Sequence, residues 1–279
     1  MSLEQLIDSG RVWRYESRTS GQSSFQTSEP ALAFYDSEVR QDVTHSDRPF
    51  QSASQPAPQP VQLATGYSVL DRVLTDKGWP CNGVTELIYA NDGIGELSLL
   101  LPALRTLSRG QRWIIWIAPP FQLNSIALAA EDIDVHNHIV LSPGSDRDVW
   151  WACEEAIKSG ACSAVLAWPG LSGENRRSQQ SSQKAYACLR RLQIAAAQHK
   201  VACFLYRQSA QPAMDQAGSP SSLRLQLRPD TTSGALMVEV LKQRGPRPHE
   251  QMSVKIPRPQ PFHYSRLSDL KHLLQTAAI

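Results

Sequence analysis

The sequence predicts an α/β fold with a mainly parallel sheet covered by helices on both faces. Two observations support this class. Short apolar runs alternate with amphipathic stretches, and most of these runs are apolar throughout instead of alternating with polar residues. A strand that is buried on both faces of a sheet has such a continuous apolar sequence, whereas a strand with one solvated face alternates.

Five apolar runs predict the central strands of the sheet. They are short and contain many β-branched and aromatic residues, as strands do. The runs are residues 84–90, 112–118, 138–141, 163–168 and 201–206. Two further runs, at 223–227 and 235–241, are separated by a polar turn and predict a hairpin at one edge of the sheet.

Three stretches between these runs have the 3.6-residue period of amphipathic helices. Leucines repeat at this spacing over 97–107, where Pro102 is expected to kink or shorten the helix. The second helix is predicted over 146–159, just before Gly160, a residue type that favours helix C-termini. The third is predicted around 185–196.

Composition divides the chain into four segments. Residues 1–15 form an N-terminal amphipathic segment, and residues 16–64 form a Ser/Gln/Pro-rich linker that we expect to be disordered. The α/β core is expected over 65–245. Residues 246–279 form a basic, proline-rich tail that ends in a short amphipathic helix. We expect its apolar face either to dock into a groove of a partner or to fold back on the core; this face is Leu267, Leu270, Leu273 and Leu274.

Several classes of protein are disfavoured by composition. No apolar run reaches the roughly 18–20 residues that a membrane helix needs, and the N-terminus lacks the layout of a signal peptide. We therefore expect a cytoplasmic protein that does not act in the membrane. The five cysteines include no C-x-x-C pair, which favours reduced core thiols over a disulfide scaffold or a zinc site.

Positive charge is concentrated at the C-terminal end. From Lys242 onward there are seven basic and two acidic residues, so this part carries +5 and the preceding residues carry −3. Such a tail is typical of an arm that binds nucleic acid or an acidic protein surface, although a simple solvated extension has the same composition. Arg247, Lys255 and Arg258 are its candidate phosphate contacts.

The loop after the first central strand is the candidate ligand site. In a parallel α/β sheet, phosphates bind at this place, and a working P-loop reads G-x-x-x-x-G-K-[ST]. Here Gly95 keeps the second glycine, whereas Ala90 occupies the first glycine position. Glu96 replaces the phosphate-binding lysine, and Leu97 replaces the metal-binding hydroxyl.

These replacements disfavour nucleotide chemistry. A carboxylate about 4 Å from a phosphate charge is repelled by roughly 4 kcal/mol at an effective dielectric near 20. The strand that should end in a metal-positioning aspartate ends in Trp168. We therefore expect a degenerate site with no catalytic residue, cofactor or metal. The alternative is that this corner is an ordinary strand-turn-helix connection that never was a P-loop.

Two stretches resemble RecA recombinases. Residues 65–89, which begin T-G-Y-S-V-L-D, resemble the approach to the RecA P-loop. Residues 238–248 resemble the RecA strand whose basic residues reach the nucleotide of a neighbouring subunit, and Lys242 and Arg244 match those positions. The resemblance implies a RecA-like core. It also implies self-association, in which Lys242, Arg244 and the N-terminal segment around Trp13 would contact a protomer or partner.

A more extensive resemblance is to the ImuA family. The segments that carry it are 3–14, 93–104, 112–120, 159–168 and 240–245. Part of this set also resembles SulA, a shorter protein that lacks the V-L-K-Q-R-G strand and the basic tail. On these residues the chain is identified as a member of the ImuA family.

This resemblance implies a non-catalytic accessory protein of SOS-induced translesion DNA synthesis. Its partners would be an ImuB-like, polymerase-related protein and an error-prone DNA polymerase, with RecA as a further candidate. The alternative is a SulA-like inhibitor that binds the division GTPase. A nucleotide-regulated recombination ATPase is a third hypothesis, which Glu96, Leu97 and Trp168 oppose.

The resemblance also identifies a candidate DNA-contacting loop. Residues 169–183 lie where RecA places such a loop, and Arg176 and Arg177 are its candidate phosphate contacts. Glu174 is close to both, and the loop has no aromatic residue on which a base could stack. We therefore expect at most weak, salt-sensitive DNA binding.

Overall fold

A computed structural model describes six ranges of the chain. These are residues 12–14, 62–170, 179–208, 218–230, 235–245 and 252–255. The linker was expected over 16–64, and its residues 16–61 lie outside the described residues, as do most of the tail and residues 171–178. Its last residues belong to the folded core, because Leu63 is buried and pairs with Trp79.

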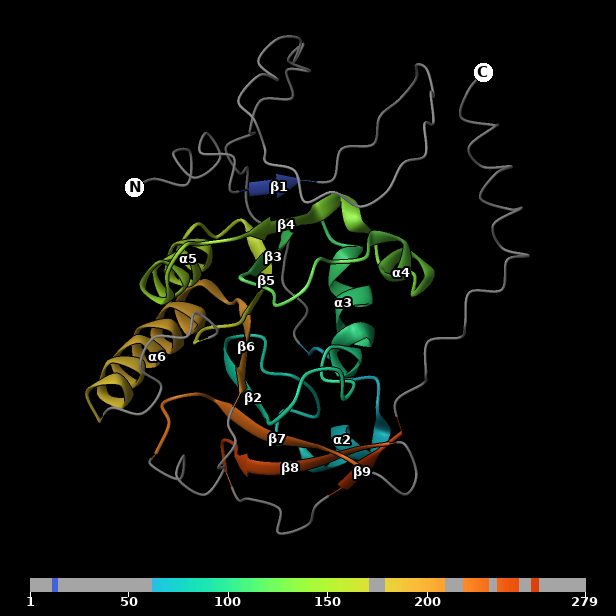
Figure 1. Ribbon diagram of the computed structural model, residues 1–279. Coiled ribbons are helices and arrows are strands. Elements are labelled where there is room, and N and C mark those ends of the chain that lie inside the picture. The colour runs from blue at the N-terminus through green and yellow to red at the C-terminus, as the bar shows by residue number, and fades with distance from the viewer. Residues whose placement is uncertain are drawn as a thin grey trace, which may run out of the picture. The chain divides into compact units, whose positions relative to one another are not determined.

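The described residues contain one mixed sheet of nine strands (Figure 1). Its spatial order is β1-β4-β3-β5-β6-β2-β7-β8-β9. The strands are β1 (Val12–Arg14), β2 (Gly83–Tyr89), β3 (Trp113–Ile117), β4 (His138–Leu141), β5 (Cys162–Ala167), β6 (Ala202–Gln208), β7 (Leu223–Pro229), β8 (Leu236–Lys242) and β9 (Met252–Val254).

Parallel pairing dominates the centre of this sheet. The five pairs that join β4 through to β7 are all parallel. Antiparallel pairing is confined to the two ends, where β1 joins β4 and where β8 joins β7 and β9. The predicted fold class is confirmed, and so is the hairpin of β7 and β8.

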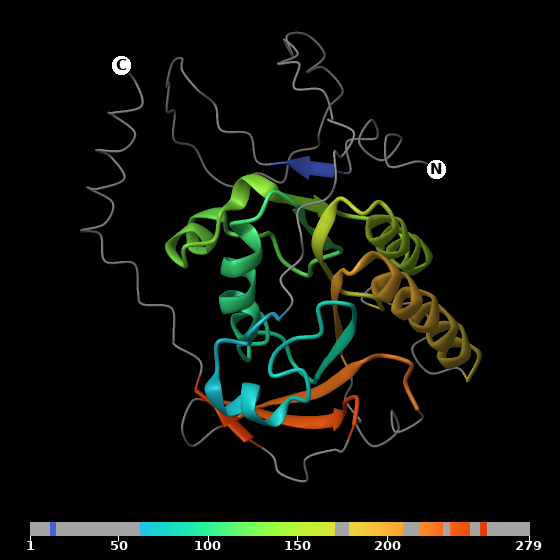
Figure 2. The same cartoon turned by 180° about the vertical axis from the view of Figure 1, so that it is seen from behind.

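Helices lie on both faces of the sheet, as Figure 1 and the reverse view in Figure 2 show. One face is covered by α5 (Asp146–Lys158) and α6 (Gln179–His199), and the buried side chains of both helices join one apolar cluster. The other cluster includes side chains of α2 (Ser68–Val73), α3 (Leu101–Ser108) and α4 (Ser125–Ala130). Two short 3₁₀ turns, η1 (Ser98–Leu100) and η2 (Val135–Asn137), complete the elements.

Pro102 shortens the predicted leucine-rich helix. The regular part of this stretch starts at Leu101, with Pro102 in its first turn, and the preceding residues form η1. Proline has no N–H to donate, so it is tolerated only where the helix needs no such donor. The leucine spacing predicted the buried face, and the proline decided where the α-helix begins.

The T-G-x-x-x-L-D motif forms a closed turn that leads into α2. The backbone N–H of Thr65 donates to Asp71 Oδ1 at 2.9 Å, and the Thr65 hydroxyl and Tyr67 exchange two further hydrogen bonds. Gly66 has φ +86°, and a Cβ at this position would lie 2.4 Å from Pro102 Cβ. The motif therefore has a structural reason that is independent of any ligand.

Two edge strands were not predicted. Val12–Arg14 pairs with β4, although the helical spacing of the N-terminal segment covers only earlier residues. Met252–Val254 pairs with β8, so the sheet extends beyond residue 245, the expected end of the core. Both strands have three residues, too few to show a period in the sequence.

Three of the cysteines are core residues. Cys153, Cys162 and Cys203 are buried thiols, and burial raises the pKa of each, to about 12 for Cys162. Across the described ranges, no helix is both long enough and apolar enough to cross a membrane.

Candidate functional site

The degenerate loop lies at the carboxyl edge of three neighbouring parallel strands. β6 lies between β2 and β5, so the ends of these strands meet at one edge. The loop 90–97 follows β2, Trp168 follows β5, and Gln208 ends β6. This is the place where α/β sheets bind ligands.

The loop is closed by its own side chain. Glu96 Oε1 accepts a hydrogen bond from the backbone N–H of Gly93 at 3.0 Å. In a P-loop, backbone N–H groups of this kind donate to phosphate oxygens. Gly93 and Gly95 have φ of +79° and +97°, a conformation that favours glycine. The Glu96 carboxylate therefore occupies a donor that a phosphate would otherwise use.

A second carboxylate ties the loop to the sheet. Asp92 Oδ2 accepts a hydrogen bond from Gln208 Nε2 at 2.7 Å, which connects the loop after β2 to the end of β6. Burial raises the pKa of the Tyr89 hydroxyl well above its usual range, and the nearby negative charges of Asp92 and Glu96 raise it further. The two carboxylates of the loop would repel a polyphosphate at this corner.

Trp168 fills the position expected for a metal-positioning carboxylate. Its indole is 4% exposed and stacks on Tyr206, with ring centroids 4.4 Å apart and ring planes 6° apart. The Trp168 indole also stacks on the indole of Trp116, with ring centroids 6.1 Å apart and ring planes 10° apart. Stacked aromatic rings gain attraction beyond their buried area, so these rings stabilise the corner and fill its volume.

His138 ends this aromatic row. Its Nδ1 accepts a hydrogen bond from Trp116 Nε1 at 3.1 Å, which requires an unprotonated Nδ1. Burial lowers the pKa of His138 to about 4, so the ring is neutral near pH 7. Over the described residues, no group of His, Cys, Asp and Glu side chains is arranged to hold a metal ion.

The candidate contact residues Trp13 and Lys242 lie near opposite ends of the sheet. Trp13 is in β1, at one edge, whereas Lys242 is in β8, which is next to the other edge. The Lys242 ammonium donates to the carbonyl of Ser219. Arg244 is exposed and follows β8. These residues do not form one site within a single chain, and their expected contact with a protomer or partner stays a prediction.

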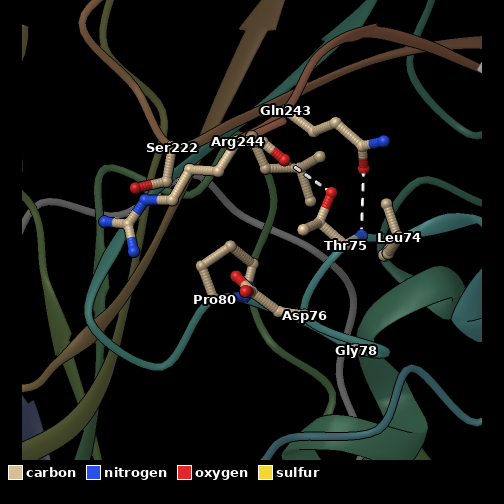
Figure 3. Close-up of a pocket in the computed structure, with 9 residues that line it drawn as sticks. Leu74, Thr75, Asp76, Gly78, Pro80, Ser222, Gln243 and Arg244 are labelled. Atoms are coloured by element: carbon tan, nitrogen blue, oxygen red, sulfur yellow. Dashed lines mark hydrogen bonds between the residues drawn. The ribbon is translucent and has the colours of Figure 1, made fainter. Parts of the chain in front are cut away.

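Arg244 borders a small hollow (Figure 3). The turn after α2 is held there by the end of β8: Thr75 N donates to Gln243 Oε1 at 3.1 Å, and Thr75 Oγ1 donates to the carbonyl of Arg244 at 2.5 Å. The close-up shows the Arg244 guanidinium directed away from this hydrogen-bonded turn. The hydrogen bonds that hold this turn therefore involve backbone groups and neutral side chains.

A buried ion-pair cluster was missed in the sequence. Glu86, on β2, is fully buried, and its Oε2 accepts from Arg207 Nη1 at 2.6 Å. The hydroxyl groups of Ser219 and Ser221 donate to its Oε1. Burial acts to raise the pKa of Glu86, but Arg207, Arg224 and the two hydroxyls more than offset this, so the pKa is lowered. Glu86 thus joins residues on both sides of the segment 209–217.

Of the remaining candidate contact residues, only Lys255 lies among the described residues. Lys255 is exposed, at the end of β9. The other candidate DNA contacts and the leucines of the tail lie outside the described residues; they are Arg176, Arg177, Arg247, Arg258, Leu267, Leu270, Leu273 and Leu274.

Strand order explains which site residues could have been found earlier. Ala167 pairs with Leu205 in the parallel register of β5 and β6, so the next residues, Trp168 and Tyr206, are adjacent. Two aromatic residues at the ends of two apolar runs were visible in the sequence. Their contact depends on β5 and β6 being neighbours, which no local pattern shows.

Comparison with known proteins relates the central part of the chain to cell division inhibitors. The family profile "Cell division inhibitor SulA" matches residues 82–189, from β2 into α6. SulA of Serratia proteamaculans is 32% identical over 114 residues, which are 40% of this chain and 68% of that protein.

Other relatives match over a smaller share of their length. SulA of Serratia marcescens is 33% identical over 103 residues, or 37% of this chain and 61% of that protein. SulA of Yersinia pestis is 29% identical over 94 residues, which are 33% of this chain and 56% of that protein. The chain therefore spans less than two thirds of these two relatives. The names are those of SulA proteins, so the finer assignment to the ImuA family stays a prediction.

A solved structure supports the fold. The crystal structure of the RadB recombinase covers 70% of this chain and 96% of its own chain, with a TM-score of 0.56 and 13% sequence identity. Similarity at this level of identity concerns the fold alone. It confirms the expected RecA-like core.

Proposed function

This chain belongs to the SulA family, and we propose on that premise that it inhibits cell division during the response to DNA damage by binding a protein of the division machinery. The observation that carries the proposal is the match of the segment from β2 into α6 to proteins named as cell division inhibitors. The division GTPase is the proposed target, which places the site of action in the cytoplasm.

Action by binding, without catalysis, is supported by the geometry of the loop. Glu96 occupies a backbone donor that would otherwise serve a phosphate, and Leu97 has no oxygen to bind a metal. Trp168 follows β5, where nucleotide hydrolysis would need a carboxylate, and it is held there by stacking on Tyr206. The RecA-like core would then serve as a rigid scaffold that presents a binding surface.

Controlled expression tests the proposal. The intact chain is induced to graded levels, and cell length is measured together with the assembly of purified division GTPase in its presence. We expect long, undivided cells and reduced GTPase assembly at a stoichiometric concentration. Normal division at high expression, combined with unchanged assembly, would refute inhibition of division.

A second candidate function is that of an accessory protein in translesion synthesis. The strands β7, β8 and β9 lie beyond the matched residues 82–189 and extend the sheet, so the chain has structured parts that the match does not account for. The similarity of 240–245 to ImuA lies in this extension. An ImuB-like protein and an error-prone polymerase would then be the partners.

Two measurements in one strain separate the candidates. The gene is deleted and restored, and both damage-induced mutation frequency and cell length after damage are recorded. A loss of induced mutations with unchanged filamentation supports the translesion role. A loss of filamentation with unchanged mutation frequency supports inhibition of division.

A further inference from the structure

An apolar patch is exposed on and just before α4. Phe121 is 67% exposed and Ile126 is 56% exposed. Among the large hydrophobic residues that the structure describes, these two are the most exposed. Ala127, Ala129 and Ala130 of the same helix are also exposed, whereas Leu128 is buried. We call Phe121, Ile126, Ala127, Ala129 and Ala130 the α4 patch. Exposed apolar patches commonly mark protein-binding surfaces.

The patch is built on a fixed support. Asn124 caps α4, since its Oδ1 accepts from the N–H of Ala127 at 3.0 Å. Pro119 and Pro120 precede Phe121 and restrict the backbone that presents its ring. Leu128 anchors the helix in the core. A preorganised apolar anchor loses little conformational entropy on binding, which favours association.

The rim of the patch is acidic. Glu131, Asp132 and Asp134 follow α4 directly. Arg105 is the cation that pairs with Glu131, at 3.2 Å, and its side chain also donates to the Glu131 carbonyl. Asp134 also pairs with the imidazole of His136, whose Nδ1 lies 2.6 Å from its Oδ1. Three carboxylates beside one guanidinium and one imidazole still leave the balance of charge negative.

A second exposed apolar surface provides a contrast. Tyr186 is 46% and Ile194 is 50% exposed on α6, which covers the opposite face of the sheet from α4 (Figure 1). α6 has basic residues, among them Arg190, and no acidic residue. The two surfaces therefore offer similar apolar exposure with opposite charge at the rim.

The geometry points to the α4 patch as the docking surface for a protein partner that presents an apolar groove rimmed by lysine or arginine side chains. This inference rests on the proposed action by protein binding. Phe121 enters the groove as the central anchor, and the carboxylates around it pair with the basic rim. Aromatic anchors near the centre of an interface carry most of its binding energy, while rim charges mainly set the association rate and salt dependence.

Site-specific photocrosslinking in damaged cells tests the surface. A benzoylphenylalanine replaces Phe121 in one full-length protein and Tyr186 in the matched control, and crosslinked peptides are identified by mass spectrometry. We expect one partner at position 121 and not at 186, with the crosslinked peptide lying among lysine or arginine residues. The double variant Asp132→Asn and Asp134→Asn should reduce this adduct. Asparagine suits the positive φ of Asp132 and can still accept the hydrogen bond that Asp134 accepts from His136 N.

Affinity for the identified partner is then measured with purified proteins. Phe121→Asp with Ile126→Asp should weaken binding by about 30-fold or more, the scale of an interface hot spot. Ile194→Asp should change it by less than about twofold. Circular dichroism of each full-length variant confirms that the fold is retained, since the substituted side chains are exposed.

The outcomes separate this inference from the proposed function. No adduct at 121, equal adducts at both positions, a second copy of this chain as the partner, or an acidic crosslinked peptide would overturn the docking surface. A specific, basic partner outside both the division and lesion-synthesis machineries would support the surface and refute the proposed function. Filamentation without a specific adduct at 121 would refute the surface alone.

Discussion

The indole of Trp168 stacks on the phenol of Tyr206 with ring planes 6° apart, at the carboxyl ends of β5 and β6. Both side chains are buried, at 4% and 1% exposure. The stack fills the space at the end of β5 where the P-loop interpretation expects a carboxylate, so no carboxylate is available at this place.

Restoring the P-loop residues should not restore hydrolysis. In the double variant Glu96→Lys and Leu97→Thr, the lysine and the hydroxyl return, but Trp168 still fills the carboxylate position. We expect no phosphate release from ATP and magnesium above that of Glu96→Gln, the matched control. Measured turnover would show that the corner is not a degenerate P-loop of the inferred alignment.

The stack should contribute strongly to stability. Trp168→Ala removes a buried ring and its contact with Tyr206, which we expect to cost about 3–5 kcal/mol of unfolding free energy. Trp168→Phe keeps an aromatic ring and should cost clearly less. Urea denaturation of both variants checks the difference, and equal losses would mean that ring stacking contributes little.

Glu86 should be essential for stability at neutral pH. Glu86→Gln removes a fully buried carboxylate that pairs with Arg207 and Arg224, at an expected cost of about 3–5 kcal/mol. Glu155→Gln, on the surface of α5, should cost at most about 1 kcal/mol. Denaturation midpoints at pH 7 compare the two.

The Glu86 contribution should also depend on pH. Its pKa is lower in the folded protein than the ordinary value of 4.5. The folded state therefore binds this proton less readily than the unfolded state, so the stabilisation is present above pH 4.5 and is lost as the pH falls through the folded value. Glu86→Gln should lose this part of the acid sensitivity. An unchanged pH profile would contradict the assignment.

His138 should reduce stability between pH 6.5 and 4. Its pKa is lowered from 6.5 to about 4 by burial, so in this window the unfolded state binds a proton that the folded state does not. Stability should therefore fall by about 3 kcal/mol as the pH decreases across the window. His138→Asn keeps a hydrogen-bond acceptor that does not titrate, and its pH slope in this range should be flatter. Equal slopes would show that His138 is not the titrating group.

Gly66 should tolerate alanine less well than Gly93. Both have positive φ, which costs an alanine about 1–2 kcal/mol. A Cβ on Gly66 would also lie 2.4 Å from Pro102 Cβ, whereas a Cβ on Gly93 meets nothing within 4 Å. Gly66→Ala should therefore cost roughly 1–3 kcal/mol more than Gly93→Ala. Thermal unfolding of the two variants measures the difference, and equal losses would mean that Pro102 gives way.

Much of the core was predictable because its strands are buried on both faces. Continuous apolar runs identified β2 to β6, and leucine spacing identified the buried face of α3. β1 and β9 could not be identified in this way, because three residues show no period and both depend on the edge that accepts them. α4 was missed for a related reason: it is a short helix held by the Asn124 cap and by packing of Leu128.

Some features of the candidate site could likewise be predicted from the sequence, whereas others depend on the tertiary structure. Glu96 and Leu97, at the lysine and hydroxyl positions of the loop, are local facts, and the sequence by itself determined that this loop departs from a working P-loop. Tertiary structure alone decided how the loop is tied to the sheet and how Glu86 on β2 is paired. Gln208 reaches Asp92, and Arg207 reaches Glu86, because β6 pairs with β2. Side-chain contacts between strands depend on the order of strands in the sheet, and that order arises from packing of the whole chain and not from any local period.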